Sequence, residues 1–513
     1  MSLWRVLKTA FLMLCLILPL AARAQYSYSD NGDGTCVITG YAGPAGPLSI
    51  PQTINGLTVT SIGDQAFYQD LSITSVSIPE GLTSVDDYAF SLCGNLTQVS
   101  FPNSLTNIGA FAFGVCTNLS SVSIPSNVTS LSVQAFDFCY RLTNVYFPDT
   151  LTNIASRAFD SCDRLPGVII PRSVISIASD AFSACTNLVA ISVAPDNAYY
   201  SSTNGVLFDK QQKTLIEWPA GKSGDYTMPE SVTGMEDYAF VQAYYLTNLT
   251  AGSHLTNIAN DAFSACINLA NVTLGDAVGV IGTNAFESCY GLTNITFGKG
   301  PISFEDGAFD ACESLQTISL PVNLLSIGDY AFEACQSLNN IIIPGSTTNL
   351  GYGAFENCAQ LTNAVIPAAL TVIGDESFGF CNNLKYVYFK GNQPIIRDIF
   401  GYPPVYIFEY DASATVYYLP GTKGWTNTFA GFPVSVWNPQ VQTGDGHFGV
   451  SSNSFGFNIT GTTNLPVLVE AATQLTAPSW VSLFSGSVTN GEIYFSDPQW
   501  MNYPRRFYRI RSP

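Results

Sequence analysis

Apolar side chains recur along most of this chain in a fixed order that repeats every 23 residues. The most regular of them is a phenylalanine, usually preceded by alanine, which keeps this spacing through two blocks separated by one interruption. A fixed period of this length is typical of a solenoid, in which each repeat packs only against its neighbours. The anchor phenylalanines are Phe67, Phe90, Phe113, Phe136, Phe159, Phe182, Phe240, Phe263, Phe286, Phe309, Phe332, Phe355 and Phe378.

The consensus repeat is Ala-Phe-x-x-Cys-x-x-Leu-Thr-x-Val-x-Ile-Pro-x-x-Leu-Thr-x-Ile-Gly. Its Val-x-Ile part alternates apolar and polar positions, which predicts a short strand ended by the proline. Its Ala-Phe-x-x-Cys-x-x-Leu part has apolar residues three or four positions apart, which predicts one helical turn. Gly109 suits a corner with positive φ. Stacked repeats would align their strands into a parallel sheet face over an interior filled by anchors such as Phe90, Phe113, Phe136, Cys93, Cys116 and Cys139.

This repeat resembles the BspA-like, Treponema pallidum-type class of bacterial leucine-rich repeats. The segments 55–63 and 417–425 are similar to the usual entry and exit of that family, so the resemblance covers about residues 26–438. It implies a mainly β leucine-rich repeat superhelix with short helical turns and a parallel sheet face. Family members are typically exported or surface proteins, and several are implicated in adhesion to host matrix proteins or in contact between bacteria. The resemblance therefore implies a binding or adhesion role.

The first 24 residues have the composition of a secretory signal peptide. Arg5 and Lys8 precede an apolar run, and Ala22-Arg23-Ala24 fits the small-x-small cleavage rule. We therefore expect an exported protein, secreted or attached to the cell surface, with no transmembrane helix in the mature chain. The expected divisions are a signal peptide at 1–24, an N-terminal cap at 25–58, a repeat solenoid at 59–438 with an enlarged repeat or hairpin at 194–228 and a C-terminal cap at 390–438, a linker at 439–447 and a small all-β domain at 448–513.

The period is interrupted once, between Phe182 and Phe240. Two β-rich segments, 204–209 and 214–219, flank a polar turn there and predict an inserted hairpin. One interpretation is an enlarged repeat whose aromatic residues fill the core. The other is a protruding contact element that carries Tyr199, Tyr200 and Trp218.

After the linker the 23-residue period is lost. Segments 455–459, 466–470, 480–484 and 492–495 are rich in β-forming residues, which predicts a small all-β, sandwich-like domain. It resembles a C-terminal module on exported proteins of environmental bacteria. Three roles remain open for it: a sorting or surface-attachment signal, glycan binding through Trp480 and Trp500, or a stabilising end-cap.

The cysteines form a column, because most of them stand three residues after an anchor phenylalanine. At that position cysteine acts as a small buried apolar residue, so the spacing favours buried thiols. Disulfides between adjacent rungs and metal binding are the alternatives. No Cys-x-x-Cys pair occurs, and residues 30–34 lack the ligand pattern of a calcium loop. We therefore expect no metal and no cofactor.

Charge and composition argue against several function classes. The formal charge of −19 disfavours nucleic acid as a partner, because phosphate binding needs a basic face. The mature chain has two histidines, His254 and His447, and neither belongs to a recognisable catalytic set. Acids that follow the anchor phenylalanine, such as Asp137, Asp160 and Asp310, are expected to be solvated. We predict a protein that is not an enzyme, although an unrecognised carboxylate pair stays possible in principle.

Two positions in each repeat are predicted to face solvent from the sheet, and they hold mostly serine, threonine and asparagine. Extended faces of this kind serve as binding surfaces in solenoids. The simpler interpretation is that these polar side chains only keep the exposed sheet face hydrated. The expected partner is an extracellular protein or polysaccharide, and the oligomeric state is left open. The candidate contact residues are Asn144, Tyr146, Asn248, Asn271, Asn294, Asn340, Asn363, Tyr386 and Tyr388.

Overall fold

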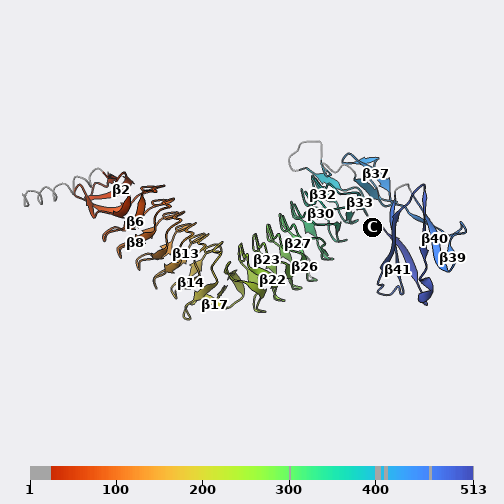
Figure 1. The fold of residues 1–513 in the computed structure, drawn as a ribbon, viewed down its shortest axis with the longest axis horizontal. Coiled ribbons are helices and arrows are strands. Elements are labelled where there is room, and N and C mark those ends of the chain that lie inside the picture. The colour runs from red at the N-terminus through yellow and green to blue at the C-terminus, as the bar shows by residue number, and fades with distance from the viewer. Residues whose placement is uncertain (1–24, 300–301, 399–405, 409–413, 462–464, 512–513) are drawn as a thin grey trace, which may run out of the picture. The chain divides into compact units, whose positions relative to one another are not determined.

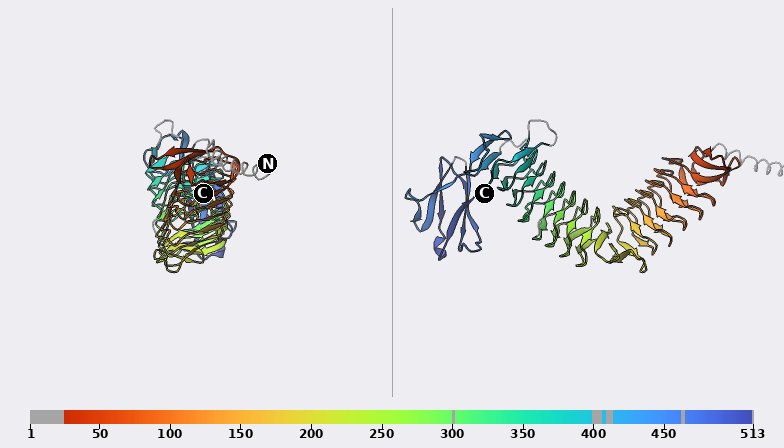
Figure 2. Two further views of the ribbon diagram at one scale, coloured as in Figure 1. Left: turned by 90° about the vertical axis from the view of Figure 1, so that its left-hand side faces the viewer. Right: turned by 180° about the vertical axis from the view of Figure 1, so that it is seen from behind.

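The structure is a computed structural model that describes residues 25–299, 302–398, 406–408, 414–461 and 465–511. The predicted signal peptide at 1–24 lies outside the described residues. The chain divides into two compact units, one up to Leu292 and the other from Thr293. In each unit short strands stack one above the next along the chain, as Figures 1 and 2 show. The mainly β solenoid predicted from the sequence is confirmed.

The strand predicted for the Val-x-Ile part of the repeat is present, and its copies pair in parallel. Ser75 lies opposite Gln98 and Ser77 opposite Ser100, so the register is one full repeat. Positions that are equivalent in sequence therefore align in columns across the sheet. In the first unit these strands are β6 (Ile73–Ser77), β8 (Gln98–Ser100), β10 (Ser121–Ser123), β12 (Asn144–Tyr146), β14 (Gly167–Ile170), β16 (Ala190–Val193), β20 (Gly224–Thr227), β22 (Leu246–Thr250) and β24 (Asn271–Thr273).

A second row of strands, which the sequence analysis did not predict, is formed by the Leu-Thr-x-Ile part of the repeat. The threonine hydroxyl donates to a main-chain carbonyl of the preceding coil, as from Thr106 to Thr83 at 3.0 Å. In the first unit this row consists of β5 (Leu57–Ile62), β7 (Ser84–Val85), β9 (Asn107–Ile108), β11 (Ser130–Leu131), β13 (Asn153–Ile154), β15 (Ser176–Ile177), β21 (Gly234–Met235), β23 (Asn257–Ile258) and β25 (Val280–Ile281).

The segment Ala89–Leu96 forms a run of tight turns where one helical turn was expected. Leu92 has a φ of 63°, which lies outside the right-handed helical region. The main-chain N–H of Phe90 donates to the carbonyl oxygen of Ala112 in the next coil at 2.8 Å. Backbone hydrogen bonds thus run between coils on this side as well. Apolar residues three or four apart suit both conformations, so their spacing could not distinguish them.

Gly109 does not have the positive φ that was expected of it. A Cβ atom added there would lie 2.6 Å from the carbonyl carbon of Asp86 and 2.7 Å from the nitrogen of Asp87 in the preceding coil. Glycine is required because two coils approach closely at this corner. The left-handed residue is Phe111, with a φ of 53°.

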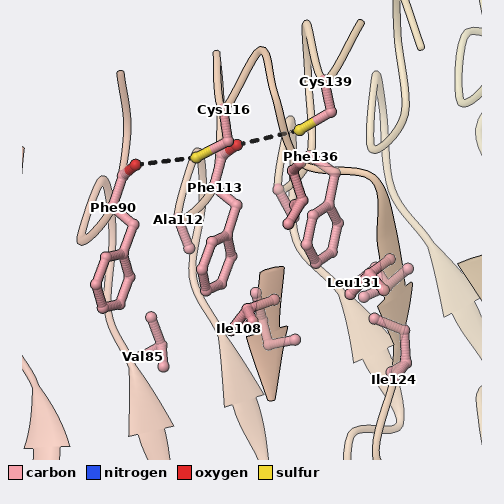
Figure 3. Packing of buried hydrophobic residues seen from close by; sticks show 14 of the residues in the cluster. Val85, Phe90, Ile108, Ala112, Phe113, Cys116, Ile124, Leu131, Phe136 and Cys139 are labelled. Atoms are coloured by element: carbon pink, nitrogen blue, oxygen red, sulfur yellow. Dashed lines mark hydrogen bonds between the residues drawn. The ribbon is translucent and has the colours of Figure 1, made fainter. Parts of the chain in front are cut away.

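The anchor phenylalanines form a buried column of stacked rings. The ring centroids of Phe90 and Phe113 lie 5.2 Å apart, and those of Phe113 and Phe136 lie 5.5 Å apart. Figure 3 shows this row together with the cysteine column beside it. The Sγ atom of Cys116 donates to the carbonyl oxygen of Phe90 at 3.2 Å. The described cysteines are buried thiols and form no disulfide bonds, in agreement with the interpretation that the spacing favours.

The N-terminal cap and the inserted hairpin both supply an aromatic ring to this column. The cap contains β1 (Tyr26–Asp30), β2 (Thr35–Tyr41), β3 (Gly46–Ser49) and β4 (Thr53–Ile54), and the ring of Tyr41 packs 5.6 Å from Phe67. The inserted segment forms three antiparallel strands, β17 (Tyr200–Thr203), β18 (Val206–Asp209) and β19 (Thr214–Glu217). Just after it, Trp218 is buried and stacks 5.7 Å from Phe240, as an anchor phenylalanine would. Trp218 is therefore a core residue and does not protrude.

The second unit also contains two rows of strands. One row contains β26 (Asn294–Thr296), β29 (Asn340–Ile342), β31 (Asn363–Ile366), β33 (Tyr386–Phe389), β35 (Thr415–Tyr418) and β37 (Phe432–Val436), with β36 (Thr428–Phe429) beside β37. The other contains β27 (Ser303–Phe304), β28 (Ser326–Ile327), β30 (Asn349–Leu350), β32 (Val372–Gly374) and β34 (Ile395–Arg397). Part of the predicted cap at 390–438 lies outside the described residues.

The chain ends in an all-β module built from two antiparallel sheets. One sheet holds β38 (Gln440–Gln442), β39 (Gly449–Ser451), β40 (Ser454–Thr460) and β43 (Glu492–Asp497), and the other holds β41 (Pro466–Ala472), β42 (Val481–Ser487) and β44 (Phe507–Arg511). A short 3₁₀ helix, η1 (Trp500–Asn502), precedes β44. The segment predicted as a linker, 439–447, contains β38, which pairs with β40. The polar composition of this segment did not predict β38, which lies at the edge of the sheet.

Candidate binding surface

The predicted contact residues lie on the outer side of the first row of strands, which we call the strand face. In the first unit Ser123 lies opposite Tyr146, and Asn248 lies opposite Asn271. The side chains of each column therefore point the same way from neighbouring strands. The sequence predicted this alignment, because the 23-residue period within each block brings equivalent residues into one line.

Two large apolar side chains stand out of the strand face in the first unit. Tyr146 is 63% exposed and Ile169 is 69% exposed. Tyr146 ends β12 and borders a surface hollow of about 340 Å³. Polar side chains of Gln98, Ser100 and Ser123 line the same hollow, which gives it hydrogen-bonding groups beside an aromatic ring. Aromatic rings with adjacent polar groups are the usual anchors of protein and sugar contacts.

The asparagine column forms a ladder of side-chain amides. Asn271 donates through Nδ2 to Oδ1 of Asn248 at 2.7 Å, and Asn248 bonds to Asp225 in turn. Each amide has two N–H donors and an acceptor oxygen, so one ladder bond uses only part of its capacity. Asn144 follows a different pattern and donates to the hydroxyl of Thr143 at 3.0 Å. Asn144 and Asn271 are exposed and Asn248 is half-buried, so the ladder presents preorganised hydrogen-bonding groups at the surface.

The remaining asparagines of this column belong to the second unit. Asn294 and Asn340 are exposed, whereas Asn363 is half-buried. Asn363 donates to Thr362 Oγ1 at 3.0 Å and lies 3.5 Å from Oδ1 of Asn340.

Tyr388 is not part of an exposed surface, which corrects its prediction as a contact residue. It is 4% exposed and belongs to a buried cluster that includes Phe457 and Ile459 of the C-terminal module. Tyr386 packs partly buried against the same cluster. The C-terminal module therefore covers the strand face over β33 and β35. Tyr146 stands at the equivalent position of an earlier repeat and is exposed, so residue type alone did not reveal this cover.

The basic cluster near the C-terminus is partly neutralised by carboxylates, because Arg509 and Arg511 share the single carboxylate of Glu470. Glu470 accepts from Nε of Arg509 at 2.7 Å and from Nε of Arg511 at 2.9 Å. Burial works against ionisation of Glu470, but these bonds to Arg511 and Arg509 hold its pKa below the usual value. The guanidinium group of Arg509 also lies over the ring of Trp480, 4.3 Å from its centroid. One face of Trp480 is thus already occupied and unavailable as a platform for a sugar ring.

The prediction that Asp137 is solvated is wrong. Its side chain is fully buried, and burial raises its pKa despite a hydrogen bond from Gln134. Asp160 in the next coil has its pKa raised to about 7 by burial and by the charge of Asp137. These carboxyls face the neighbouring coil because the turn that follows the anchor phenylalanine is not helical. No group of three or more His, Cys, Asp or Glu within the described ranges is arranged to hold a metal ion.

Several solved structures are similar to this chain. Among solved structures, a leucine-rich cell surface protein from Faecalibacterium prausnitzii is 27% identical over 72% of this chain and 94% of its own, with a TM-score of 0.49. A leucine-rich repeat protein from Bacteroides ovatus is 22% identical over 76% of this chain and 98% of its own, with a TM-score of 0.46. The pneumococcal vaccine antigen PcpA is 19% identical over 77% of this chain and 92% of its own, with a TM-score of 0.48.

The comparison with curated proteins gives no match. In the part of the chain that the structure describes, no helix has the length and apolar character needed to cross a membrane. The model of the BspA type leucine-rich repeat region matches in six copies over residues 60–189, 222–313 and 302–402, which together exceed half of the chain. With its 23-residue period and two rows of parallel strands, this chain belongs to the BspA-type leucine-rich repeat family.

Proposed function

We propose that this protein is an exported, non-catalytic binding protein that holds an extracellular protein or polysaccharide on the strand face of residues 73–273. Membership of a leucine-rich repeat family supports a binding role. The observation that carries the proposal is the exposed pair Tyr146 and Ile169, which stand among aligned serine and asparagine side chains. Several weak contacts at regular spacing suit an extended or repetitive ligand, because such a ligand meets successive coils in the same way.

The proposal is tested by a binding screen of the mature chain, residues 25–513, on immobilised matrix proteins and polysaccharides. The informative variant is Tyr146→Ala combined with Ile169→Ser. We expect it to lose at least about tenfold in affinity, because truncated aromatic anchors commonly cost more than 1 kcal/mol.

The matched control is Tyr68→Ala combined with Leu71→Ser, which removes an exposed aromatic and an exposed aliphatic side chain from the turn side of the same unit. Binding that falls equally in both double variants, or in neither, contradicts recognition by the strand face. Thermal unfolding of all three proteins checks that the variants remain folded.

Export is tested by N-terminal sequencing of the protein recovered from the cell surface and the growth medium. Cleavage after Ala24 gives Gln25 as the first residue. A chain that stays in the cytoplasm with an intact Met1 contradicts this part of the proposal.

A further inference from the structure

The second unit contains a crevice that is distinct from the exposed strand face of the first unit. It lies where β44 of the C-terminal module meets β29, β31, β33 and β35. Two adjoining hollows make it up, an inner one of about 200 Å³ and an outer one of about 510 Å³. Ile342, Val365 and Arg511 line both hollows, so the two lie side by side.

The inner hollow is mainly apolar and aromatic. Tyr388 and Tyr417 stack with ring centroids 5.4 Å apart, and Trp437 and Ile510 line the same space. A cavity of about 150 Å³ with apolar walls is large enough for benzene. The inner hollow is therefore suited to one aromatic ring or a branched aliphatic group.

One residue that lines this hollow carries a buried polar atom without a hydrogen-bond partner among the described residues. The phenol oxygen of Tyr388 is buried and makes no hydrogen bond to any described residue. A buried polar group without a partner costs about 1–3 kcal/mol, so native proteins seldom retain one without a reason. Burial raises the pKa of Tyr388, which keeps the hydroxyl group protonated and able to donate.

Two cations stand at the rim of the inner hollow. Lys390 and Arg511 both line it, and the charge of Arg511 adds to burial in lowering the pKa of Lys390. Arg511 is bonded to Glu470, whereas the described part of the chain places no carboxylate against the Lys390 ammonium group. Positive charge at a rim is unusual in a chain with a net charge of −19. An anionic group of a ligand would relieve the repulsion between the two cations.

We propose that this crevice binds an organic acid that has an aromatic or branched apolar group. The apolar group occupies the inner hollow beside Tyr388 and Tyr417, and the carboxylate lies between Lys390 and Arg511. The acid is either a free small molecule or the C-terminal residue of a peptide. In the second case the preceding peptide residues follow the outer hollow, which Asn340, Asn363 and Ser319 supply with hydrogen-bonding groups.

The test is calorimetric titration of the mature chain, residues 25–513, with four probes. They are phenylacetate, its neutral analogue phenylacetamide, the peptide Gly-Gly-Phe and the same peptide with an amidated C-terminus. We expect at least one acid to bind saturably and its amide to bind at least about tenfold more weakly, because a charge-assisted hydrogen bond contributes about 1.5–3 kcal/mol. Binding of phenylacetate alone identifies a free acid, and tighter binding of the peptide identifies a chain terminus.

Two variants locate the site. Lys390→Met is expected to weaken acid binding about tenfold, while Lys385→Met, which removes an exposed lysine of the same repeat that does not line the crevice, leaves it unchanged. Ile342→Trp is expected to abolish binding by filling the entrance, and Ile342 is exposed enough to accept the change. The proposal is overturned if no acid binds at millimolar concentration, if acid and amide bind equally, or if the two lysine variants behave alike. These residues are not part of the strand face of the first unit, so either proposal can fail without the other.

Discussion

Phe113 occupies the middle of the buried ring column, with Phe90 and Phe136 stacked on its two sides. An anchor phenylalanine inside the column, such as Phe113, contacts the repeat before it and the repeat after it. Truncation of one ring therefore leaves a cavity that weakens two interfaces between coils. The neighbouring cysteine fills the remaining space with a small side chain whose thiol bonds to a carbonyl oxygen of the previous coil.

Replacement of Phe113 by alanine should lower the free energy of unfolding by about 3–5 kcal/mol, the range for buried phenylalanine. Chemical denaturation measures the change. Tyr68→Ala is the control, because this exposed ring should cost less than about 0.5 kcal/mol. Similar losses in both variants would contradict the assignment of the phenylalanine column as the core.

The cysteine thiols should resist alkylation in the folded protein. Burial raises the pKa of the Cys93 thiol to about 12 and also raises the pKa of the Cys116 thiol well above its usual value. At pH 8 about one Cys93 thiol in ten thousand is ionised, and only the thiolate reacts. Iodoacetamide followed by mass spectrometry should label the column only after denaturation. Rapid labelling of the native protein, or mass loss that indicates disulfides, would contradict the buried thiols.

Asp160 should make stability depend on pH in a defined direction. Its pKa is raised to about 7 by burial and by the charges of Asp137 and Asp180, against the opposing charge of Arg157. Between about pH 4 and pH 7 the folded chain holds a proton that the unfolded chain has lost, so this group lowers stability as pH rises through that window. Above pH 7 the penalty is complete.

The measurement is the denaturation midpoint at pH 5 and pH 8. Asp160→Asn cannot ionise and should gain more stability relative to the native sequence at pH 8 than at pH 5, because most of the penalty develops above pH 5. Asp149→Asn, a change at an exposed position of the same coil, should give no such difference. An identical pH dependence in all three proteins would show that Asp160 ionises freely in the folded state.

At the scale of the repeat, coil spacing is set by close backbone contacts as much as by the core. A Cβ atom added to Gly351 would overlap the carbonyl group of Gly328 in the preceding coil. The same corner is tight at Gly109, where a Cβ atom would meet backbone atoms of Asp86 and Asp87 in the preceding coil. These glycines allow neighbouring second-row strands to approach within hydrogen-bonding distance.

Gly351→Ala should therefore destabilise the second unit by about 1–3 kcal/mol, the usual cost of overpacking. Gly345→Ala is the matched control, because a Cβ atom there meets no atom within 4 Å. Thermal unfolding distinguishes the two variants. A harmless Gly351→Ala would mean that the coils can separate at this corner without cost.

At the scale of the whole chain, the C-terminal module determines which part of the strand face is exposed in the second unit. Val365, Tyr388 and Tyr417 are buried because residues of the module, including Phe457 and Val467, pack in the same cluster. A chain that ends at residue 438 should expose this cluster. It should bind a hydrophobic dye and aggregate more readily than the chain that ends at residue 513. A truncated protein that stays monomeric and binds no dye would contradict the burial of this cluster by the C-terminal module.

The repeat, the parallel strand face and the alignment of contact columns were predictable from the sequence, because the strict 23-residue period determines which residues meet. The turn conformation was not, since the spacing around Phe90 fits a helical turn as well as a run of tight turns. The burial of Tyr388 and the crevice at Lys390 and Arg511 depend on contacts between segments far apart in the sequence. Periodicity carries no information about such contacts.

The most direct test of the binding face is photo-crosslinking from position 146. Tyr146 is replaced by benzoylphenylalanine, a photoreactive aromatic residue that its exposed position can accommodate, and the same replacement at Tyr68 is the control on the turn side. The protein is irradiated with a matrix protein or polysaccharide that binds it in the screen. Recognition by the strand face predicts a crosslinked product from position 146 and none from position 68. Crosslinking from position 68 alone, or from neither position while binding persists, would contradict it.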